Sequence, residues 1–321
     1  MKVFIAGASG VLGRRLIRQF LARGHSVIGQ VRSAKAESAV REAGGEPRFA
    51  DLFDAESLAR AAEGCDTVIH AATAIPTKQK TTPADWAMND RIRRKGTRCL
   101  TEAAAKIGAK TYLQQSVVWV ANPKDGSPFN EDSPIVSDSL VQSSVDAEMI
   151  AREAASTEGF TAAILRGGAF YDCDSAHTRM LAEGVRQRAM PIIGRGDAVW
   201  SVIHTDDGAS AYVAAAENPR NGIWHIVDDE PVSVRALLET IAERLGAPCP
   251  RRVPVWLARL VAGERAVAYF TRSTRTSNAR FRRDYGWAPK YPTYREGLEQ
   301  VVAAWNKPGL TQAAANSKFG A

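Results

Sequence analysis

Three glycines near the start of the chain are spaced so that they could hold a phosphate. Gly7, Gly10 and Gly13 follow an apolar run and lead straight into an amphipathic segment. The first glycine permits a tight turn after a strand, the second lets backbone N–H groups approach a pyrophosphate, and the third lets a helix pack closely on the sheet. The positive end of that helix also attracts phosphate, so this GxxGxxG spacing predicts a dinucleotide-binding loop.

The end of the second predicted strand indicates which dinucleotide the loop holds. An acidic residue there would bind the ribose 2′-hydroxyl of NAD, but the strand predicted over 27–31 is followed by Arg32. A guanidinium suits the 2′-phosphate of NADP, and Arg14, directly after the last glycine, could reach the same phosphate. We therefore expect NADP (NADPH) as cofactor, with NAD the less favoured alternative.

Short apolar segments alternate with helical ones along the first half of the chain. This alternation, with a glycine turn first, predicts an α/β fold: a Rossmann doubly wound parallel sheet with helices on both faces and a smaller C-terminal substrate lobe. The ligand should lie at the carboxyl edge of the sheet. The predicted strands after the first are 27–31, 47–50, 67–72, 111–115 and 160–165, and the predicted helices between and after them include 34–43, 55–62, 86–106, 145–155 and 207–217.

These elements divide the chain into three parts. We expect residues 1–165 to form an NADP-binding Rossmann domain, completed by parts of 198–228. Residues 166–305 should form most of an interspersed substrate-binding lobe. The Ala-, Gly- and polar-rich segment 306–321 is expected to be a flexible tail.

Composition limits the kinds of partner. The chain is 45% hydrophobic and 24% charged, and no run approaches the roughly 20 apolar residues of a membrane-spanning helix, so we expect a cytoplasmic protein that does not bind membranes. Its four cysteines are far apart and show no metal-ligand spacing, so we predict no metal site.

Positive charge is concentrated late in the chain, since residues 244–295 carry twelve Lys and Arg against two acidic residues, Glu264 and Asp284. No nucleic-acid motif accompanies this charge, so we interpret the segment as a solvated surface rather than a nucleic-acid interface, and an anionic small-molecule substrate stays possible.

Several motifs together resemble the extended short-chain dehydrogenase/reductases, the NAD-dependent epimerase/dehydratase family. The resemblance covers nearly the whole chain and is specific for the family rather than for a substrate. It rests on the glycine loop, Asp51-Leu52, His70-Ala71-Ala72, Asn89 with Gly96-Thr97-Arg98, Ser116, Leu165 to Tyr171, Val202 to Asp207, Ser277-Asn278-Ala279, and Tyr285 to Pro289.

The resemblance implies a Rossmann domain that binds NAD(P), over which a smaller lobe closes. Asp51 and Leu52 would border the adenine, and Ser116 would orient a substrate carbonyl. The cofactor-binding residues expected in this way are Gly7, Ser9, Gly10, Val11, Leu12, Gly13, Arg14, Arg32, Asp51, Leu52, Ala71, Ala72, Thr73, Gln115 and Gly168.

The sequence departs from the family at the catalytic pair, Tyr-x-x-x-Lys. In that pair the lysine charge lowers the tyrosine pKa, so that the phenol can exchange a proton with the substrate oxygen. If Glu148 is aligned with the glutamate that follows the family's lysine, Leu140 takes the tyrosine position and Ser144 the lysine position. No tyrosine lies between Ser116 and Glu148, so a small shift of the alignment cannot restore the pair.

Three interpretations remain open at this point. The first, which we favour because Ser116 and the substrate lobe are retained, is an NADP-linked oxidoreductase with a replacement proton donor. Tyr171 is the leading candidate for that donor, although it could equally be a packing residue, and Ser116, His177 or a water held by Ser144 are weaker ones. The second is a non-catalytic NADP(H) sensor resembling NmrA-like regulators, and the third is a redox-neutral lyase or isomerase.

Family members commonly pair through two long helices, predicted here over 86–106 and 145–155, so a homodimer is plausible. Arg93, Arg94 and Lys95 lie within the first of these helices. In a helix of this kind they would have to point outward or find acidic partners.

Overall fold

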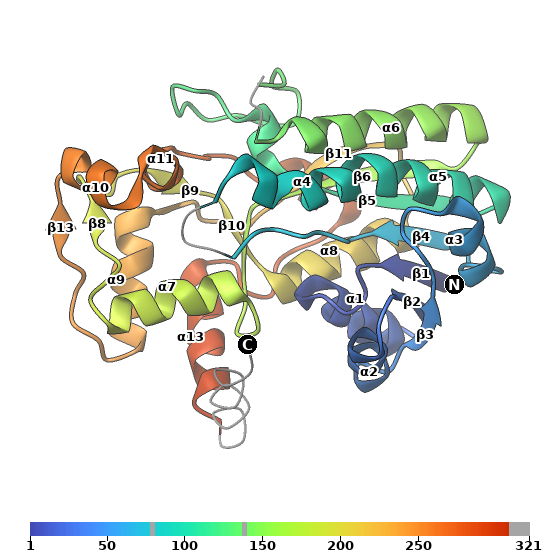
Figure 1. Cartoon of the computed structure of the whole chain (residues 1–321), viewed down its shortest axis with the longest axis horizontal. Coiled ribbons are helices and arrows are strands. Elements are labelled where there is room, and N and C mark those ends of the chain that lie inside the picture. Colours follow the sequence, from blue (N-terminus) through green and yellow to red (C-terminus); the bar gives the residue numbers. More distant parts are fainter. Residues whose placement is uncertain (78–80, 137–139, 308–321) are drawn as a thin grey trace.

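Seven parallel strands form the central sheet of the protein (Figure 1). The structure is a computed structural model that describes residues 1–77, 81–136 and 140–307, with the side chains of residues 265 and 266 left out. Crossover connections carry the chain outward in both directions from β1, as expected of a doubly wound sheet. In spatial order the strands are β11 (Gly222–Ile226), β6 (Thr161–Gly167), β5 (Thr111–Val117), β4 (Thr67–His70), β1 (Lys2–Ala6), β2 (Ser26–Val31) and β3 (Glu46–Phe49).

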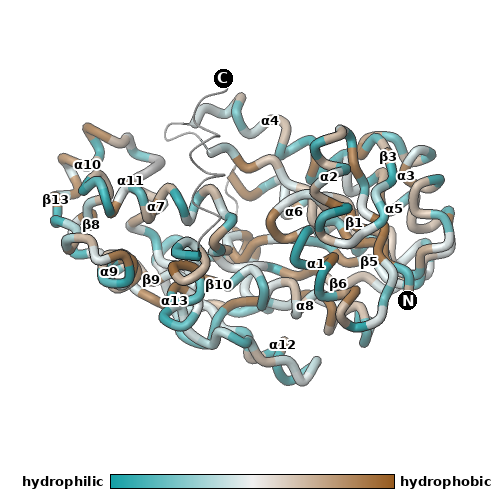
Figure 2. Tube along the Cα trace, turned by 90° about the horizontal axis from the view of Figure 1, so that it is seen from below, coloured by the Kyte–Doolittle hydropathy of each residue, from teal (hydrophilic) through white to brown (hydrophobic). Residues whose placement is uncertain are grey.

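Helices cover both faces of this sheet, and each face contributes one apolar core. On one face Leu16 and Phe20 of α1 pack with Tyr212 of α8 against the strands, and on the other Leu58 of α3 packs with Leu100 of α5. Both faces of the inner strands are therefore buried, and hydrophobic segments gather around β1 and β5 in Figure 2, whereas the edge strand β3 is more exposed. The helices of this domain are α1 (Val11–Ala22), α2 (Ala34–Glu42), α3 (Ala55–Ala61), α4 (Pro83–Arg91), α5 (Thr97–Lys106), α6 (Gln142–Glu158) and α8 (Thr205–Glu217), with a short 3₁₀ segment η2 (Val118–Ala121).

A second, smaller lobe is built around three two-stranded pairs and has its own apolar core. It lies beyond the carboxyl ends of the central strands, at the left of Figure 1. Its strand pairs are β7 (Ala169–Tyr171) with β10 (Val202–His204), β9 (Val199–Trp200) with β12 (Val232–Ser233), and β8 (Ile192–Ile193) with β13 (Arg252–Val253); its helices are α7 (Ala176–Arg186), α9 (Val234–Arg244), α10 (Val255–Ala262), α11 (Glu264–Thr271) and α13 (Tyr294–Trp305), while α12 (Ala279–Tyr285) packs near β11.

The predicted fold class is confirmed, and most elements agree with the sequence to within a few residues. Two short strands, β9 and β10, are separated by Ser201 and pair with different partners. The long helix expected over 86–106 is divided. A π-helical segment, η1 (Ile92–Gly96), separates α4 from α5. Residues 308–321, which include most of the predicted tail, lie outside the described residues.

Candidate cofactor and active site

The glycine loop connects β1 to α1, as its spacing predicts. Gly7 has a φ of +87°, a conformation that L side chains rarely adopt, and a Cβ there would lie 2.6 Å from the backbone of Ala71 and Ala72. A Cβ at Gly13 would overlap the carbonyl oxygen of Gly7 and lie 2.6 Å from that of Ala8, so Gly13 permits the close contact of helix and strand. Gly10 precedes the first turn of α1 with no side-chain cap, which leaves N–H groups available to an anion.

A cavity of about 550 Å³ opens in front of this loop, at the carboxyl ends of β1, β2 and β4. Its size and its position at the edge of the sheet suit a dinucleotide. Nine of the expected cofactor residues line it: Gly7, Ser9, Gly10, Arg32, Asp51, Leu52, Ala71, Ala72 and Thr73.

The two arginines expected at the cofactor have different surroundings. Arg32 is exposed and lines the cavity beside Gly7 and Gly10, and no ion pair involves it within the described part of the chain. The Arg14 guanidinium donates to the Ser9 carbonyl at 2.8 Å and pairs with Asp174 at 3.4 Å. Arg32 is therefore the arginine that is available to a ligand in the cavity.

The other expected cofactor residues do not line this cavity. Val11, Leu12 and Gly13 belong to the first turn of α1, behind the loop. Gln115 lies near the carboxyl end of β5 with a buried, unpartnered Oε1. A Cβ on Gly168 would overlap the Ser201 carbonyl oxygen, so this glycine allows two segments of backbone to touch.

Sequence reasoning missed several residues that line the cavity, above all two phenylalanines. Phe49 ends β3 with 59% of its surface exposed, and Phe53 stacks under the Arg91 guanidinium, which is 4.0 Å from the ring centroid. The signal available in the sequence was an aromatic residue near the carboxyl end of the predicted strand 47–50. The other lining residues that were missed are Gln30, Val31, Ala50, Ser57 and Ile92.

Ser116 lies at the carboxyl end of β5 in a buried polar cluster. Its hydroxyl donates to Glu148 Oε1 of α6, and Arg166 of β6 donates to both oxygens of the same carboxylate at 2.9 and 2.7 Å. Ser116 and Arg166 are register partners on adjacent strands, so their side chains leave the sheet on the same face. The Glu148 carboxylate therefore holds the Ser116 hydroxyl in place, while the Arg166 guanidinium balances the charge of that carboxylate.

The residues at the positions of the family's tyrosine and lysine lie at the start of α6. Leu140 precedes the helix and is 47% exposed. Its hydrocarbon side chain has no proton to transfer and no charge, so it cannot replace the family's tyrosine. Ser144 lies in the first turn and is buried, and its Oγ has no hydrogen-bond partner in the described residues. An unpartnered buried hydroxyl at this position is available to a ligand.

Tyr171 lies away from this cluster, on β7. Its hydroxyl donates to Asp228 Oδ2 at 3.0 Å and packs against Gly297 of α13, where any Cβ would overlap it. Burial, together with the charge of Asp228, raises the pKa of Tyr171 well above its usual value. These contacts suit a packing residue and disfavour the interpretation of Tyr171 as proton donor. His177 lies in the first turn of α7, and the structure gives it no contact with Ser116.

Ion pairs with acidic side chains involve six of the twelve basic residues of 244–295 within the described part of the chain. Arg280 pairs with Asp132, Arg282 with Asp229 at 2.7 Å, and Arg295 with Glu230 at 2.7 Å. Solvent-exposed pairs of this kind contribute little to stability, but they reduce the positive field of the segment.

Among the described residues, one cluster of side chains could hold a metal ion, formed by Asp172, Cys173 and Asp174. Arg15 pairs with both carboxylates of this cluster at 3.0 Å and Arg14 pairs with Asp174 at 3.4 Å, so two guanidinium groups already compensate its charge. No helix among the described residues is long and apolar enough to cross a bilayer.

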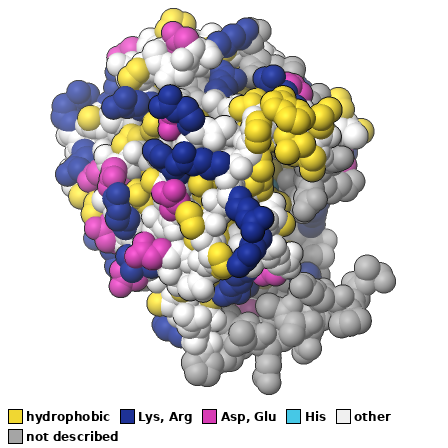
Figure 3. Space-filling model, turned by 90° about the vertical axis from the view of Figure 1, so that its left-hand side faces the viewer, with side chains coloured by type: hydrophobic (Ala, Val, Ile, Leu, Met, Phe, Trp, Pro, Cys, Tyr) yellow, Lys and Arg dark blue, Asp and Glu magenta, His cyan; other side chains and the backbone are white. Residues whose placement is uncertain are grey.

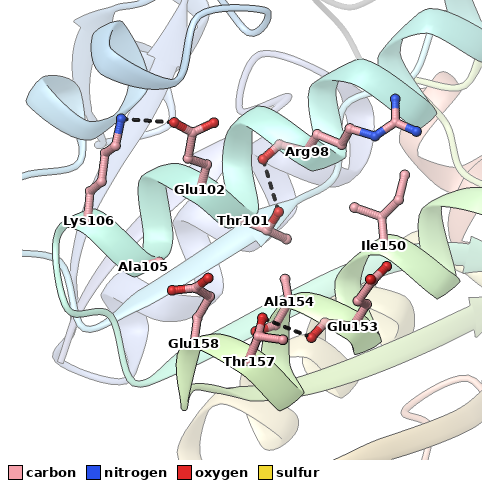
Figure 4. A pocket seen from close by; sticks show the side chains of 10 residues that line it. All are labelled: Arg98, Thr101, Glu102, Ala105, Lys106, Ile150, Glu153, Ala154, Thr157 and Glu158. Atoms are coloured by element: carbon pink, nitrogen blue, oxygen red, sulfur yellow. Dashed lines mark hydrogen bonds and ion pairs between the residues drawn. The ribbon is translucent and has the colours of Figure 1, made fainter.

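Two further surface features lie apart from the cofactor cavity. A groove of about 650 Å³ runs between α5 and α6, with Arg98 and Lys106 on the first helix and Glu153 and Glu158 on the second (Figure 4). At the other end of the molecule, hydrophobic side chains gather on one face (Figure 3). The exposed residues there are Trp256, Leu257, Leu260 and Val261 of α10 and Tyr269 of α11.

Comparison with known proteins places these features in a family. The model of the NAD dependent epimerase/dehydratase family matches residues 3–227. A 3-diazoavenalumate denitrifying reductase from a Streptomyces species is 32% identical over 310 residues, which cover 93% of this chain and 99% of that protein. The 2-alkyl-3-oxoalkanoate reductase of Shewanella oneidensis is 29% identical over 290 residues, covering 83% and 72% of the two chains.

Solved structures show the same fold at lower sequence identity. The dTDP-glucose 4,6-dehydratase of Streptomyces venezuelae, crystallised with NAD, aligns with a TM-score of 0.77 and 22% identity, over 96% of this chain and 98% of its own. The likeness extends over both the sheet and the smaller lobe, so the whole described chain follows one architecture.

Proposed function

Because the chain belongs to the NAD-dependent epimerase/dehydratase family, whose members depend on nicotinamide dinucleotides, we propose that it is an NADP(H)-dependent oxidoreductase acting on a small carbonyl or hydroxyl substrate. The observation that carries the choice of NADP is Arg32, an exposed guanidinium that lines the cavity next to the glycine loop. A 2′-phosphate would give this cation a partner, whereas NAD would not. The reductase names of the relatives support the reaction class.

The residues that line the cavity fit the parts of the cofactor. The free N–H groups at the start of α1, behind the glycine loop, would bind the pyrophosphate, and Asp51 and Leu52, which line the cavity, would border the adenine. When bound, the dinucleotide supplies or accepts the hydride. The protein must then supply the position of the substrate oxygen and a path for one proton.

We assign both tasks to Ser116. In the oxidising direction the substrate hydroxyl proton would pass to Ser116 Oγ while the serine proton passes to Glu148 Oε1, to which it is already hydrogen-bonded. Reduction runs the same transfer in reverse, so that the new hydroxyl receives its proton from Ser116. Arg166 keeps Glu148 in place through two hydrogen bonds.

Loss of NADPH absorbance with a panel of ketones, aldehydes and enones tests the proposal. Ser116→Ala should lower kcat by about 10²-fold or more, the usual contribution of a positioned acid–base group, while the Kd for NADPH stays unchanged. Ser38→Ala, at an exposed position on α2, is the matched control and should behave as wild type.

The missing tyrosine and lysine also favour a second candidate, the non-catalytic NADP(H) sensor. Tight NADPH binding without turnover of any panel member, together with a stable protein partner in a pull-down, would decide for the sensor. Conversion of substrate without net change in NADPH would decide for a lyase or isomerase.

We also propose that the protein pairs as a homodimer through the groove between α5 and α6. The groove carries Arg98 and Lys106 on α5, with Glu102 paired to Lys106, and Glu153 and Glu158 on α6, so two copies related by a twofold axis could match Arg98 of one with an acidic side chain of the other. Sedimentation of wild type beside Arg98→Glu would test this, with the variant expected to be monomeric.

A further inference from the structure

Arg93 is a buried arginine without a counter-ion. It is 9% exposed, and its Nη1 lies 3.5 Å from Ser143 Oγ, a long hydrogen bond. Among the described residues no carboxylate lies within ion-pair distance of its guanidinium, because Arg94 takes the two nearby acids, Asp146 at 2.6 Å and Asp90 at 3.9 Å. The sequence expectation that Arg93 would point outward or find an acid is therefore wrong.

A lone buried guanidinium is costly to the fold. Removing a charge from water without a partner costs several kcal/mol, and buried charges in proteins are normally paired. Burial accordingly lowers the pKa of Arg93 to about 10, with Asp90 opposing the shift. The neighbouring His70 is a buried imidazole whose pKa burial lowers to about 4, so it is neutral and offers no compensating charge.

The backbone is shaped to bury this side chain. Arg93 lies in η1, the π-helical segment that interrupts the long helix, and such segments are frequent at functional sites. Ile92, the preceding residue, lines the cofactor cavity. The segment that turns Arg93 inward is therefore also a wall of the candidate site.

Arg93 contacts the N-terminal end of α6, and the N-terminal end of a helix attracts negative charge. Its partner Ser143 lies in the first turn, next to Ser144, whose buried Oγ has no hydrogen-bond partner in the described part of the chain. Residue Val141 caps the helix without a side-chain acceptor. Arg93 therefore reaches the turn of α6 that also carries the unpartnered Ser144 hydroxyl. A guanidinium, a free hydroxyl and a helix N-terminus each favour an anion.

We propose that Arg93, Ser144 and the N-terminus of α6 form a binding site for a carboxylate of the substrate. This rests on the proposed function, because it places the carboxylate near Ser116, whose partner Glu148 lies one turn along the same helix from Ser144. The substrates for which two reductase relatives are named, 3-diazoavenalumate and a 2-alkyl-3-oxoalkanoate, are carboxylates. The substrate carboxylate would supply the negative counter-charge that Arg93 does not receive from the described residues of the protein.

Binding of a matched pair of probes to the full chain loaded with NADP⁺ tests the site. The probes are 3-oxooctanoate and its methyl ester, measured by calorimetry, and the oxidised cofactor prevents their reduction. Wild type should bind the acid at least about tenfold more tightly than the ester, and Arg93→Met should remove that preference. Arg93→Lys should keep part of it, and Arg94→Met, whose guanidinium pairs with Asp146, should keep all of it.

Thermal unfolding without ligand gives a second readout. Arg93→Met should raise the unfolding temperature, because it removes a lone buried charge, whereas a structural arginine would lower it when replaced. A wild type that binds NADP⁺ but shows no preference for the acid, or an Arg93→Met variant that keeps the preference, would overturn the proposal. Failure of wild type to bind NADP⁺ would instead overturn the proposed function.

Discussion

Replacing Gly10 by alanine should separate cofactor binding from folding. Gly10 lines the cavity, and its φ of −71° and ψ of 173° are open to any L residue. The closest atom to an added Cβ is the Gly7 carbonyl oxygen at 3.2 Å, a tight but tolerable contact. The methyl group would project where backbone N–H groups must approach the pyrophosphate.

Gly13 is the matched comparison, because it belongs to the same loop but packs inside the fold. A Cβ there would meet backbone atoms of Gly7 and Ala8 at distances that no side chain tolerates. Overpacking of this kind costs about 1–3 kcal/mol, offset by about 1 kcal/mol because alanine suits a helix better than glycine. Because the clash is with backbone atoms that cannot move aside, the upper end of this range applies, and we expect Gly13→Ala to destabilise the protein by about 2 kcal/mol. Gly10→Ala should change the free energy of unfolding by less than about 1 kcal/mol.

Urea unfolding and NADPH titration followed by fluorescence measure the two quantities separately. Gly10→Ala should weaken NADPH binding more than about tenfold, since the pyrophosphate contact is worth several hydrogen bonds to a charged group. An unchanged Kd for Gly10→Ala would refute the placement of the pyrophosphate at this loop. A loss of stability in Gly10→Ala equal to that in Gly13→Ala would show that the two glycines do not have separate roles.

Three further predictions follow from single residues. Arg32→Ala should weaken NADPH binding by about tenfold and leave NADH binding unchanged, because the guanidinium would bind only the 2′-phosphate, which NADH lacks. Equal losses of affinity for both cofactors would contradict this. Tyr171→Phe should retain activity within about twofold and lower the free energy of unfolding by about 1–3 kcal/mol, since the Asp228 carboxyl loses a hydrogen bond; inactivity in a folded variant would restore Tyr171 as proton donor. Burial lowers the pKa of His70 to about 4 and that of His225 to about 3, below the usual value near 6.5, so stability should be full above about pH 6.5 and fall as pH decreases toward 4, by about 2 kcal/mol for each histidine at pH 5. His70→Gln should flatten that fall in urea unfolding at a series of pH values, and an unchanged slope would speak against a neutral His70.

The parts that the sequence predicted well depend on local patterns. The glycine loop needs three small residues at fixed spacing between a strand and a helix, and the structure shows the reason at Gly7 and Gly13. Arg32 was found in the same way, since it follows directly on a recognisable strand. For such residues the position along the chain already determines the position in space.

The structural features that the sequence did not predict depend on contacts between distant segments of the chain. Periodicity predicts one long helix over 86–106, because the π-helical turn at η1 changes the direction of Arg93 without changing the apolar pattern. The contact of Ser116 with Glu148 and Arg166 needs the register of β5 and β6 and the packing of α6 upon them. Phe49 and Phe53 line the cavity only because β3 ends beside the glycine loop.

The loss of the family's lysine has a different meaning once the arrangement in space is known. Position by position, Ser144 is a neutral residue where a cation is expected, and the site is short of one positive charge. In the structure a cation from another helix reaches the same turn of α6, since Arg93 lies next to Ser143. A lysine at 144 would face this guanidinium in a buried space, where two like charges would repel each other, so the two residues are alternatives. On this reasoning Ser144→Lys should destabilise the wild type but be tolerated in the Arg93→Met variant. A double-mutant cycle of unfolding free energies would measure the coupling, and additive effects would show that residues 93 and 144 do not share one site.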